Sequence, residues 1–179
     1  MIKYIAFLKA INVGGHTVKM DNLKKLFEKM GFEKVETFIA SGNLVFETKS
    51  KSMDSIKKKI ESELEKSLGY NVPTFIRTTG EIKTILEYKP FKESEINNPQ
   101  NSLYIGFLDK APSKENQNKL YSLQDEANQF HFNKKELYWL CRKRFSDSGI
   151  TGNKLEKALG MKTSVRNSTT IRKMASKFS

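Results

Sequence analysis

The order in which strand-like and helix-like patterns alternate constrains the fold more than any other feature of this sequence. In the first half, apolar residues alternate as in β-strands over residues 3–9, 35–40, 44–48 and 72–77. Helix-like segments at about residues 21–30 and 52–68 follow the first and third of these strands, and a glycine ends each helix. Strand, helix, strand, strand, helix, strand is the order of a ferredoxin-like unit. We therefore predict an α+β fold whose first subdomain, residues 1–89, is a βαββαβ unit with a trailing helix.

The second half repeats this rhythm incompletely. Thr78 and Glu81 form a capping-box pattern that opens the trailing helix of the first subdomain. The polar stretch 90–100, which contains proline and asparagine, is the expected linker. Residues 101–179 then show a strand, a helix and two strands, followed by basic helices, the last from about Val165 to Phe178. We therefore expect a second α+β subdomain of order βαββ followed by helices, related to the first by the order of its elements and not by its residues.

The composition indicates a soluble globular protein. Hydrophobic residues make up 37% and charged residues 29% of the 179 residues, which is enough apolar material for a substantial core. No apolar run approaches the roughly 20 residues that a membrane-spanning helix needs. No cleavage site of small residues follows the short apolar stretch at the N-terminus. We expect a cytoplasmic protein that does not enter a membrane.

Few residues of the chain are suited to metal or covalent chemistry. A single cysteine, Cys141, excludes an intramolecular disulfide and a cysteine-based zinc cluster. It follows apolar residues on a strand-like segment, and we expect it in the core. The two histidines, His16 and His131, are not tied to a carboxylate or nucleophile by any recognisable motif. We expect no metal site and no cofactor.

Positive charge is concentrated toward the C-terminus. The formal net charge is +12, and from Arg142 onward ten basic residues accompany two acidic ones, a difference of +8. Such a concentration attracts phosphate-bearing or acidic partners. It favours nucleic-acid binding by the basic C-terminal segment. The alternative is a set of solvated helix surfaces in a chain that is rich in lysine throughout.

The strongest local signal is the pair Gly14-Gly15, which follows the first strand and precedes the first helix. Such a loop can direct backbone N–H groups toward an anion, and the helix N-terminus adds partial positive charge. Asn12 and Lys19 flank the pair and are candidates for the same site. The loop matches neither the phosphate-binding loop of nucleotide hydrolases nor the dinucleotide-binding fingerprint. A plain glycine turn is the alternative.

Two further polar motifs add candidates. Ser41, Gly42 and Asn43 form the expected turn of the hairpin between the second and third strands. Arg166, with Asn167 beside it, falls in the first turn of the predicted last helix, where a positive charge opposes the helix dipole. A residue that breaks a local rule in this way points to function.

Aromatic residues on the first and third strands raise the alternative of base stacking, as in RNA-recognition modules. Tyr4 and Phe46 occupy the strands that carry such residues. However, the third-strand motif of those modules is absent from residues 42–46. We therefore expect Tyr4, Phe7 and Phe46 to be core residues.

Several of these motifs together resemble a bacterial family catalogued as domain of unknown function 1697. The motifs that carry the resemblance are Ile11-Asn12-Val13-Gly14-Gly15, Val18-Lys19-Met20, Gly31-Phe32, Ala40-Ser41-Gly42-Asn43-Leu44-Val45-Phe46, Lys154-Leu155-Glu156-Lys157-Ala158-Leu159-Gly160 and Arg166-Asn167. The resemblance covers essentially the whole chain and implies two similar α+β subdomains, but no activity, substrate or cofactor. The chain departs from the family pattern at Lys9-Ala10, where the family commonly has Arg-Gly, and at Ser168, where it commonly has Trp.

Three hypotheses follow, in this order. The first is a binding protein for a small anionic ligand, bearing phosphate or carboxylate, near Gly14 and Gly15. The second is a nucleic-acid-binding protein that uses the basic C-terminal segment. The third is an enzyme whose acid or base is His16.

Overall fold

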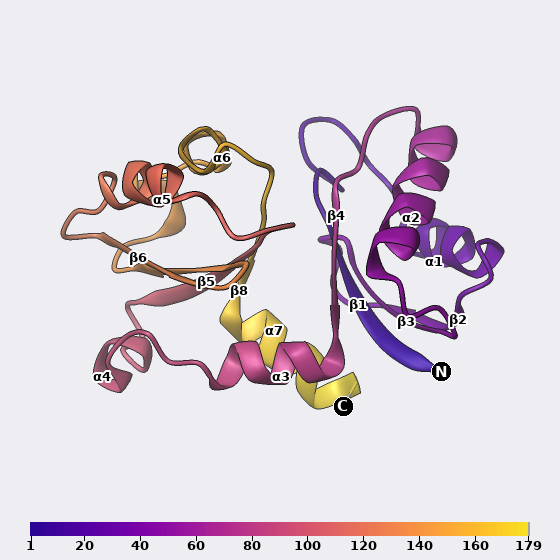
Figure 1. Cartoon of the computed structure of the whole chain (residues 1–179), viewed down its shortest axis with the longest axis horizontal. Helices are drawn as coiled ribbons and strands as arrows, with labels where there is room; N and C mark the ends of the chain where they lie inside the picture. Colours follow the sequence, from indigo (N-terminus) through magenta and orange to yellow (C-terminus); the bar gives the residue numbers. More distant parts are fainter. Residues whose placement is uncertain (179) are drawn as a thin grey trace. The chain divides into compact units, whose positions relative to one another are not determined.

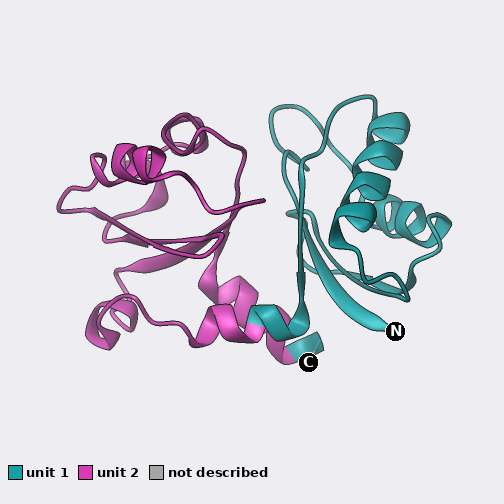
Figure 2. Ribbon diagram, viewed as in Figure 1, with its two compact units in different colours: residues 1–82, 177–179 teal, residues 83–176 magenta. Residues whose placement is uncertain are grey.

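The computed structural model describes residues 1–178, which form two compact units (Figure 2). Unit 1 comprises Met1–Ile82 together with the C-terminal residues from Lys177 on, and unit 2 comprises Lys83–Ser176. The stretch 90–100, expected as the linker, lies in unit 2 and contains the short helix α4 (Glu93–Ile96).

Unit 1 is a ferredoxin-like βαββαβ unit, as predicted (Figure 1). Its elements are β1 (Ile2–Leu8), α1 (Met20–Lys29), β2 (Glu33–Thr37), β3 (Asn43–Thr48), α2 (Met53–Leu68) and β4 (Thr74–Thr78), followed by α3 (Thr79–Glu87). The sheet order is β2-β3-β1-β4, with antiparallel neighbours throughout. The central strands β1 and β3 pair from Ile2 opposite Thr48 to Phe7 opposite Asn43.

Local sequence signals explain the helices of unit 1. In α2, the Ser52 side chain accepts a hydrogen bond from the Ser55 amide, and Gly69 ends the helix in the left-handed conformation. The apolar stripe at helical spacing is buried through Ile56, Ile60 and Leu64, where it packs in the same core as the inner face of the sheet.

The aromatic residues of the central strands belong to the core, as predicted. Tyr4, Phe7 and Phe46 are each at most 1% exposed. Tyr4 and Phe46 lie with their ring centroids 5.9 Å apart. The Tyr4 hydroxyl donates to the carbonyl of Ser50 in the β3–α2 loop at 3.1 Å. These rings have no free face on which a nucleobase could stack.

Unit 2 repeats the architecture of unit 1 in full. After α4 its elements are β5 (Ser102–Phe107), α5 (Lys114–Tyr121), β6 (Asn128–Asn133), β7 (Glu136–Cys141), the 3-10 turn η1 (Phe145–Asp147), α6 (Gly152–Leu159), β8 (Ser164–Asn167) and α7 (Ser168–Phe178). The sheet order β6-β7-β5-β8 is the order of unit 1. Figure 1 shows α5 and α6 on the same side of this sheet. The prediction of two related α+β subdomains is therefore confirmed.

One detail of that prediction was wrong. The second subdomain does not replace its closing strand with helices, because residues 164–167 form β8 and pair antiparallel with β5. Four residues rich in polar side chains carry no alternating pattern, so pairing and not periodicity defines this strand. The last helix consequently begins at Ser168 and not near Val165.

The two units also share residues, which corrects the expectation that only element order repeats. Residues 4–8 read Tyr-Ile-Ala-Phe-Leu and residues 104–108 read Tyr-Ile-Gly-Phe-Leu. Residues 4–8 lie on β1, and residues 104–107 lie on β5, the equivalent central strand. The two strands pair in the same register, Tyr4 with Phe46 and Tyr104 with Trp139. The units can therefore be compared position by position.

Candidate functional site

Two loops of unit 1 are longer than their counterparts in unit 2. Residues 9–19 connect β1 to α1, whereas residues 108–113 connect β5 to α5. Residues 38–42 connect β2 to β3, whereas only residues 134–135 connect β6 to β7. Because both units build the same sheet, the extra length is not needed for the fold, and such loops commonly carry function.

Asn12 joins these two longer loops. Its side-chain amide donates to the carbonyl of Ala40 at 2.8 Å, and its side-chain oxygen accepts from the amide of Val18 at 2.7 Å. The Asn12 backbone has a φ of 56°, a left-handed conformation that asparagine tolerates better than most residues. The predicted candidate Asn12 is thus the residue that holds the β1–α1 loop against the β2–β3 turn.

Ser41, Gly42 and Asn43 shape the other side of this junction. Gly42 has a φ of 77°, and a Cβ atom at this position would lie 3.1 Å from the Cβ atoms of Leu8 and Ile11. The side-chain amide of Asn43 donates to the Phe38 carbonyl at 3.1 Å and to the Ser41 hydroxyl at 2.8 Å. The structure therefore brings these three predicted residues close to the loop of Asn12, where their contacts stabilise the β2–β3 turn.

Gly14 and Gly15 form the exposed tip of the β1–α1 loop. Their φ values are 59° and 84°, and no atom lies within 4 Å of a Cβ built at either position. The backbone conformation, and not a close approach of another segment, therefore calls for glycine here. In residues 1–178, neither glycine amide donates to a protein acceptor. Both amides are available to a bound group.

Lys19 marks the point at which this loop enters α1. It is the N-cap residue of the helix, and its side chain makes no capping hydrogen bond. By contrast, Ser52, Ser113 and Thr151 cap α2, α5 and α6 with side-chain oxygens. The first-turn amides of Met20 and Asp21 therefore point out of the helix without a side-chain acceptor.

His16 lies on the same loop and stacks on Tyr70 from the α2–β4 connection. Their ring centroids are 3.9 Å apart, at an interplanar angle of 28°. Burial raises the pKa of the Tyr70 phenol, whose oxygen is enclosed and lacks a hydrogen-bond partner among the described residues. Within residues 1–178, no carboxylate or nucleophile is paired with His16. The contact with Tyr70 indicates that His16 supports the loop by packing on the α2–β4 connection.

Arg166 and Asn167 lie on β8 of unit 2 and not in a helix, so the conflict with a helix dipole that drew attention to Arg166 does not exist. The Arg166 guanidinium donates to the carbonyl of Val165 at 3.0 Å, and burial lowers its pKa to about 10. The Asn167 side chain accepts from the amide of Thr169 at 2.9 Å and so caps the start of α7. Arg77 of unit 1 occupies the position equivalent to Arg166, and it too donates to the preceding carbonyl, at 2.8 Å.

The basic C-terminal segment is distributed over several elements. Its residues lie on the β7–α6 loop, α6, the α6–β8 connection, β8 and α7. Lys162 pairs with Glu156 at 3.4 Å, and Lys177 pairs with Glu36 at 3.4 Å. The formal charge of the segment is thus partly neutralised by the fold.

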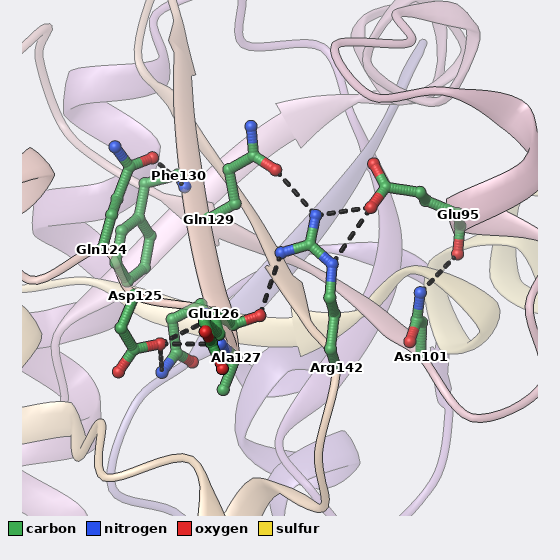
Figure 3. Close-up of polar contacts among 10 residues, drawn as sticks. Glu95, Asn101, Gln124, Asp125, Glu126, Ala127, Gln129, Phe130 and Arg142 are labelled. Carbon is green, nitrogen blue, oxygen red and sulfur yellow. Dashed lines mark hydrogen bonds and ion pairs between the residues drawn. The ribbon is translucent and has the colours of Figure 1, made fainter.

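Arg142 is bonded to groups from outside its own loop (Figure 3). Its guanidinium donates to the Glu95 carboxylate through Nε at 3.0 Å and Nη2 at 2.5 Å. It also donates to the Gln129 side chain at 2.8 Å and to the Glu126 carbonyl at 3.3 Å. In the sequence, Arg142 stands out only as one of the positive charges of the C-terminal segment. Its structural role could not be predicted from the sequence, because its acceptors come from two segments distant in the sequence, at Glu95 and at residues 126–129.

The described residues were searched for metal-binding clusters and for membrane-spanning helices. No group of three or more histidine, cysteine, aspartate and glutamate side chains within residues 1–178 is placed to hold a metal ion. No helix in that range is long and apolar enough to cross a membrane. Cys141 is fully buried on β7, as predicted.

Comparison with known proteins identifies the family. The family model described as "Protein of unknown function (DUF1697)" matches residues 1–138. The chain therefore belongs to this family, as its motifs indicated. The matched region includes every candidate residue of unit 1 and ends within β7, before Arg166 and Asn167. No curated protein matches the sequence.

One solved structure extends the likeness to the whole chain. The conserved bacterial protein SP0830 from Streptococcus pneumoniae matches with a TM-score of 0.80 and 21% sequence identity, over 99% of this chain and 98% of that one. At this identity the likeness concerns the fold alone. It shows that the fold of this chain is shared with that protein.

Proposed function

We propose that this protein binds a small anionic ligand, bearing phosphate or carboxylate, at the β1–α1 loop of unit 1. The observation that carries the proposal is the set of free donors on this loop: the amides of Gly14, Gly15, Met20 and Asp21 have no protein acceptor within residues 1–178. Two of them belong to the N-terminus of a ten-residue helix, whose dipole favours negative charge.

The side chains around the loop supply charge and rigidity. Lys19 is exposed and forms no salt bridge in the described part of the chain, so its ammonium group is free to approach an anion. Asn12 holds the base of the loop through two hydrogen bonds. A loop that is fixed before binding loses less conformational entropy when the ligand is bound. Asp21 opposes the anion, because its carboxylate lies in the same helical turn.

A thermal-shift screen against inorganic phosphate, nucleotides and phosphorylated or carboxylated metabolites tests the proposal. A ligand at about 100 times its Kd stabilises the folded state by about 2.7 kcal/mol. We expect Lys19→Ala to weaken binding and Asp21→Asn to strengthen it. Lys25→Ala is the matched control, because it removes the same charge from an exposed position of α1 about 9 Å further along the helix axis.

The pattern across these variants decides the outcome. If no anion stabilises the wild-type protein, the proposal is wrong. If Lys19→Ala and Lys25→Ala weaken binding of a ligand equally, the ligand responds to overall charge and not to this loop.

An enzyme that uses His16 as its acid or base would need a hydrogen-bonding partner for the imidazole. The contact that the structure describes for His16 is the ring of Tyr70.

A further inference from the structure

We propose that the β7–α6 loop of unit 2 binds single-stranded nucleic acid, with Phe145 as a stacking platform for a base and with Lys143 and Arg144 as phosphate contacts. This site is separate from the anion site proposed for unit 1. All the residues that form it belong to unit 2.

The first step is the length of the loop. Residues 142–151 connect β7 to α6, whereas residues 49–52 connect the equivalent β3 and α2 in unit 1. In unit 1 the short loop closes the end of the sheet when the Ser50 carbonyl accepts the hydroxyl of Tyr4. The equivalent Tyr104 of unit 2 packs instead against Phe145, with ring centroids 5.6 Å apart. The added aromatic residue is therefore not required to close this fold.

The second step is the position of Phe145. Its ring contacts Tyr104 and Trp139, the latter with centroids 5.5 Å apart, yet the residue remains 49% exposed. The residue is thus about half exposed even though its ring contacts two aromatic residues of unit 2. A seated aromatic ring with a free surface is the element that single-strand-binding proteins use to stack bases of any sequence.

The third step is charge beside the ring. Lys143 and Arg144 immediately precede Phe145, both are exposed, and neither forms a salt bridge in the described part of the chain. The acid of the loop is Asp147, two residues beyond Phe145. Cations beside an exposed aromatic ring are the combination by which single-strand-binding proteins hold backbone phosphates and stack bases.

The fourth step is the rigidity of the loop. Arg142 is fixed by Glu95, Gln129 and the Glu126 carbonyl, so it anchors the start of the loop (Figure 3). The Ser148 hydroxyl donates to the Phe145 carbonyl at 2.7 Å, and the buried Asn128 amide donates to the Ser148 carbonyl at 2.8 Å. These bonds hold the exposed ring in place before any ligand arrives, which reduces the entropic cost of binding.

Fluorescence anisotropy with labelled oligo(dT) and oligo(U) of about 12 nucleotides at low salt tests the proposal and distinguishes DNA from RNA. Phe145→Leu keeps an apolar side chain over the core but removes the stacking ring, and we expect it to weaken binding about tenfold. Phe145→Trp restores a stacking surface and is expected to bind at least as tightly as the wild type. Urea unfolding followed by far-ultraviolet circular dichroism checks that the Leu variant is folded, because the fluorescence of Trp139 responds directly to loss of the neighbouring Phe145 ring.

The charge contribution has its own measurement. Replacing both Lys143 and Arg144 by glutamine should reduce the slope of log K against log salt by about 1.4, since each lost phosphate contact on a single strand accounts for about 0.7. The matched control replaces Lys110 and Lys114 by glutamine, two exposed lysines beyond the opposite end of β5. This control should leave the slope nearly unchanged.

Three results would overturn the proposal. The first is the absence of binding to both oligonucleotides at low salt. The second is equal affinity of the Leu variant and the wild type, which would make Phe145 only a cover for the core. The third is equal binding of a duplex or of inorganic polyphosphate, which would indicate a general attraction for polyanions without stacking.

Discussion

Asn12 offers the sharpest test of how the loop of unit 1 is held. Replacing it with alanine removes the hydrogen bonds to the Ala40 carbonyl and from the Val18 amide. Because Asn12 is exposed, each bond contributes toward the lower end of the usual range, about 0.5–1 kcal/mol. A φ of 56° costs alanine about 1 kcal/mol more. We therefore expect the free energy of unfolding to fall by about 2–3 kcal/mol.

Two further substitutions at the same position separate the contributions. Asn12→Gly relieves the left-handed backbone but restores neither hydrogen bond, so it should destabilise by somewhat less than alanine. Asn12→Asp keeps an acceptor for the Val18 amide and tolerates the left-handed backbone, although it loses the donor to Ala40 and sets a second carboxylate oxygen near that carbonyl, so it should be the mildest of the three. The expected order of destabilisation is alanine, then glycine, then aspartate.

The measurement must report on unit 1. Trp139 lies in unit 2, so tryptophan fluorescence is unsuitable, and urea unfolding followed by far-ultraviolet circular dichroism should be combined with hydrogen exchange of residues 9–19. The Val18 amide should lose protection in the Ala and Gly variants and keep it in the Asp variant. If Ala and Gly both stay within about 0.5 kcal/mol of the wild type, with Val18 exchange unchanged, the inferred role of Asn12 is wrong.

Three other predictions concern one residue each. Gly42→Ala should destabilise unit 1 by at least about 2 kcal/mol in urea unfolding, because a Cβ would lie 3.1 Å from that of Ile11 in a left-handed backbone with a φ of 77°. Glu81→Ala should cost about 1 kcal/mol in the same assay, because it removes the capping box in which Glu81 accepts from the Thr78 amide at 2.8 Å. Burial, with a smaller effect of a nearby carboxylate, raises the pKa of Tyr138, so this phenol should stay protonated in ultraviolet titrations at pH values where exposed tyrosines ionise. Since the folded-state pKa is the higher one, stability should fall as the pH rises above the unfolded-state pKa.

The first unit was predictable because its local signals agree with its tertiary structure. The stripe of Ile56, Ile60 and Leu64 indicated α2, and Ser52 and Gly69 marked its ends. Each of these signals acts within a few residues, so it is legible without knowledge of distant partners.

The closing strand of unit 2 lacked such signals. Residues 164–167 combine a serine, a valine, an arginine and an asparagine, and only pairing with β5 makes them a strand. A comparison of residues 4–8 with 104–108 would have revealed the missing strand, because it places β5 in the role of β1 and therefore demands a partner equivalent to β4.

The residue types of the candidate site could be predicted from the sequence, but the contacts among those residues could not. Glycine pairs and Ser-Gly-Asn turns can be recognised from the sequence because their backbone conformations restrict the residue type. That Asn12 bonds to the turn 28 residues away could not be recognised, because the polar side chain of asparagine is compatible with many partners. Phe145 was not singled out, since exposure of one aromatic residue depends on how the whole loop is anchored.

The duplicated architecture divides the two proposed sites between different loops. Unit 1 has the longer β1–α1 and β2–β3 connections, and unit 2 has the longer β7–α6 connection. Each unit therefore serves as a reference for the other, because a loop that is short in one unit is evidently sufficient to build the sheet. If both proposals hold, Lys19→Ala should reduce binding of small anions without changing affinity for oligonucleotides, and Phe145→Leu should do the reverse. A variant that impaired both activities equally would show that the longer loops act through overall stability and not as separate binding sites.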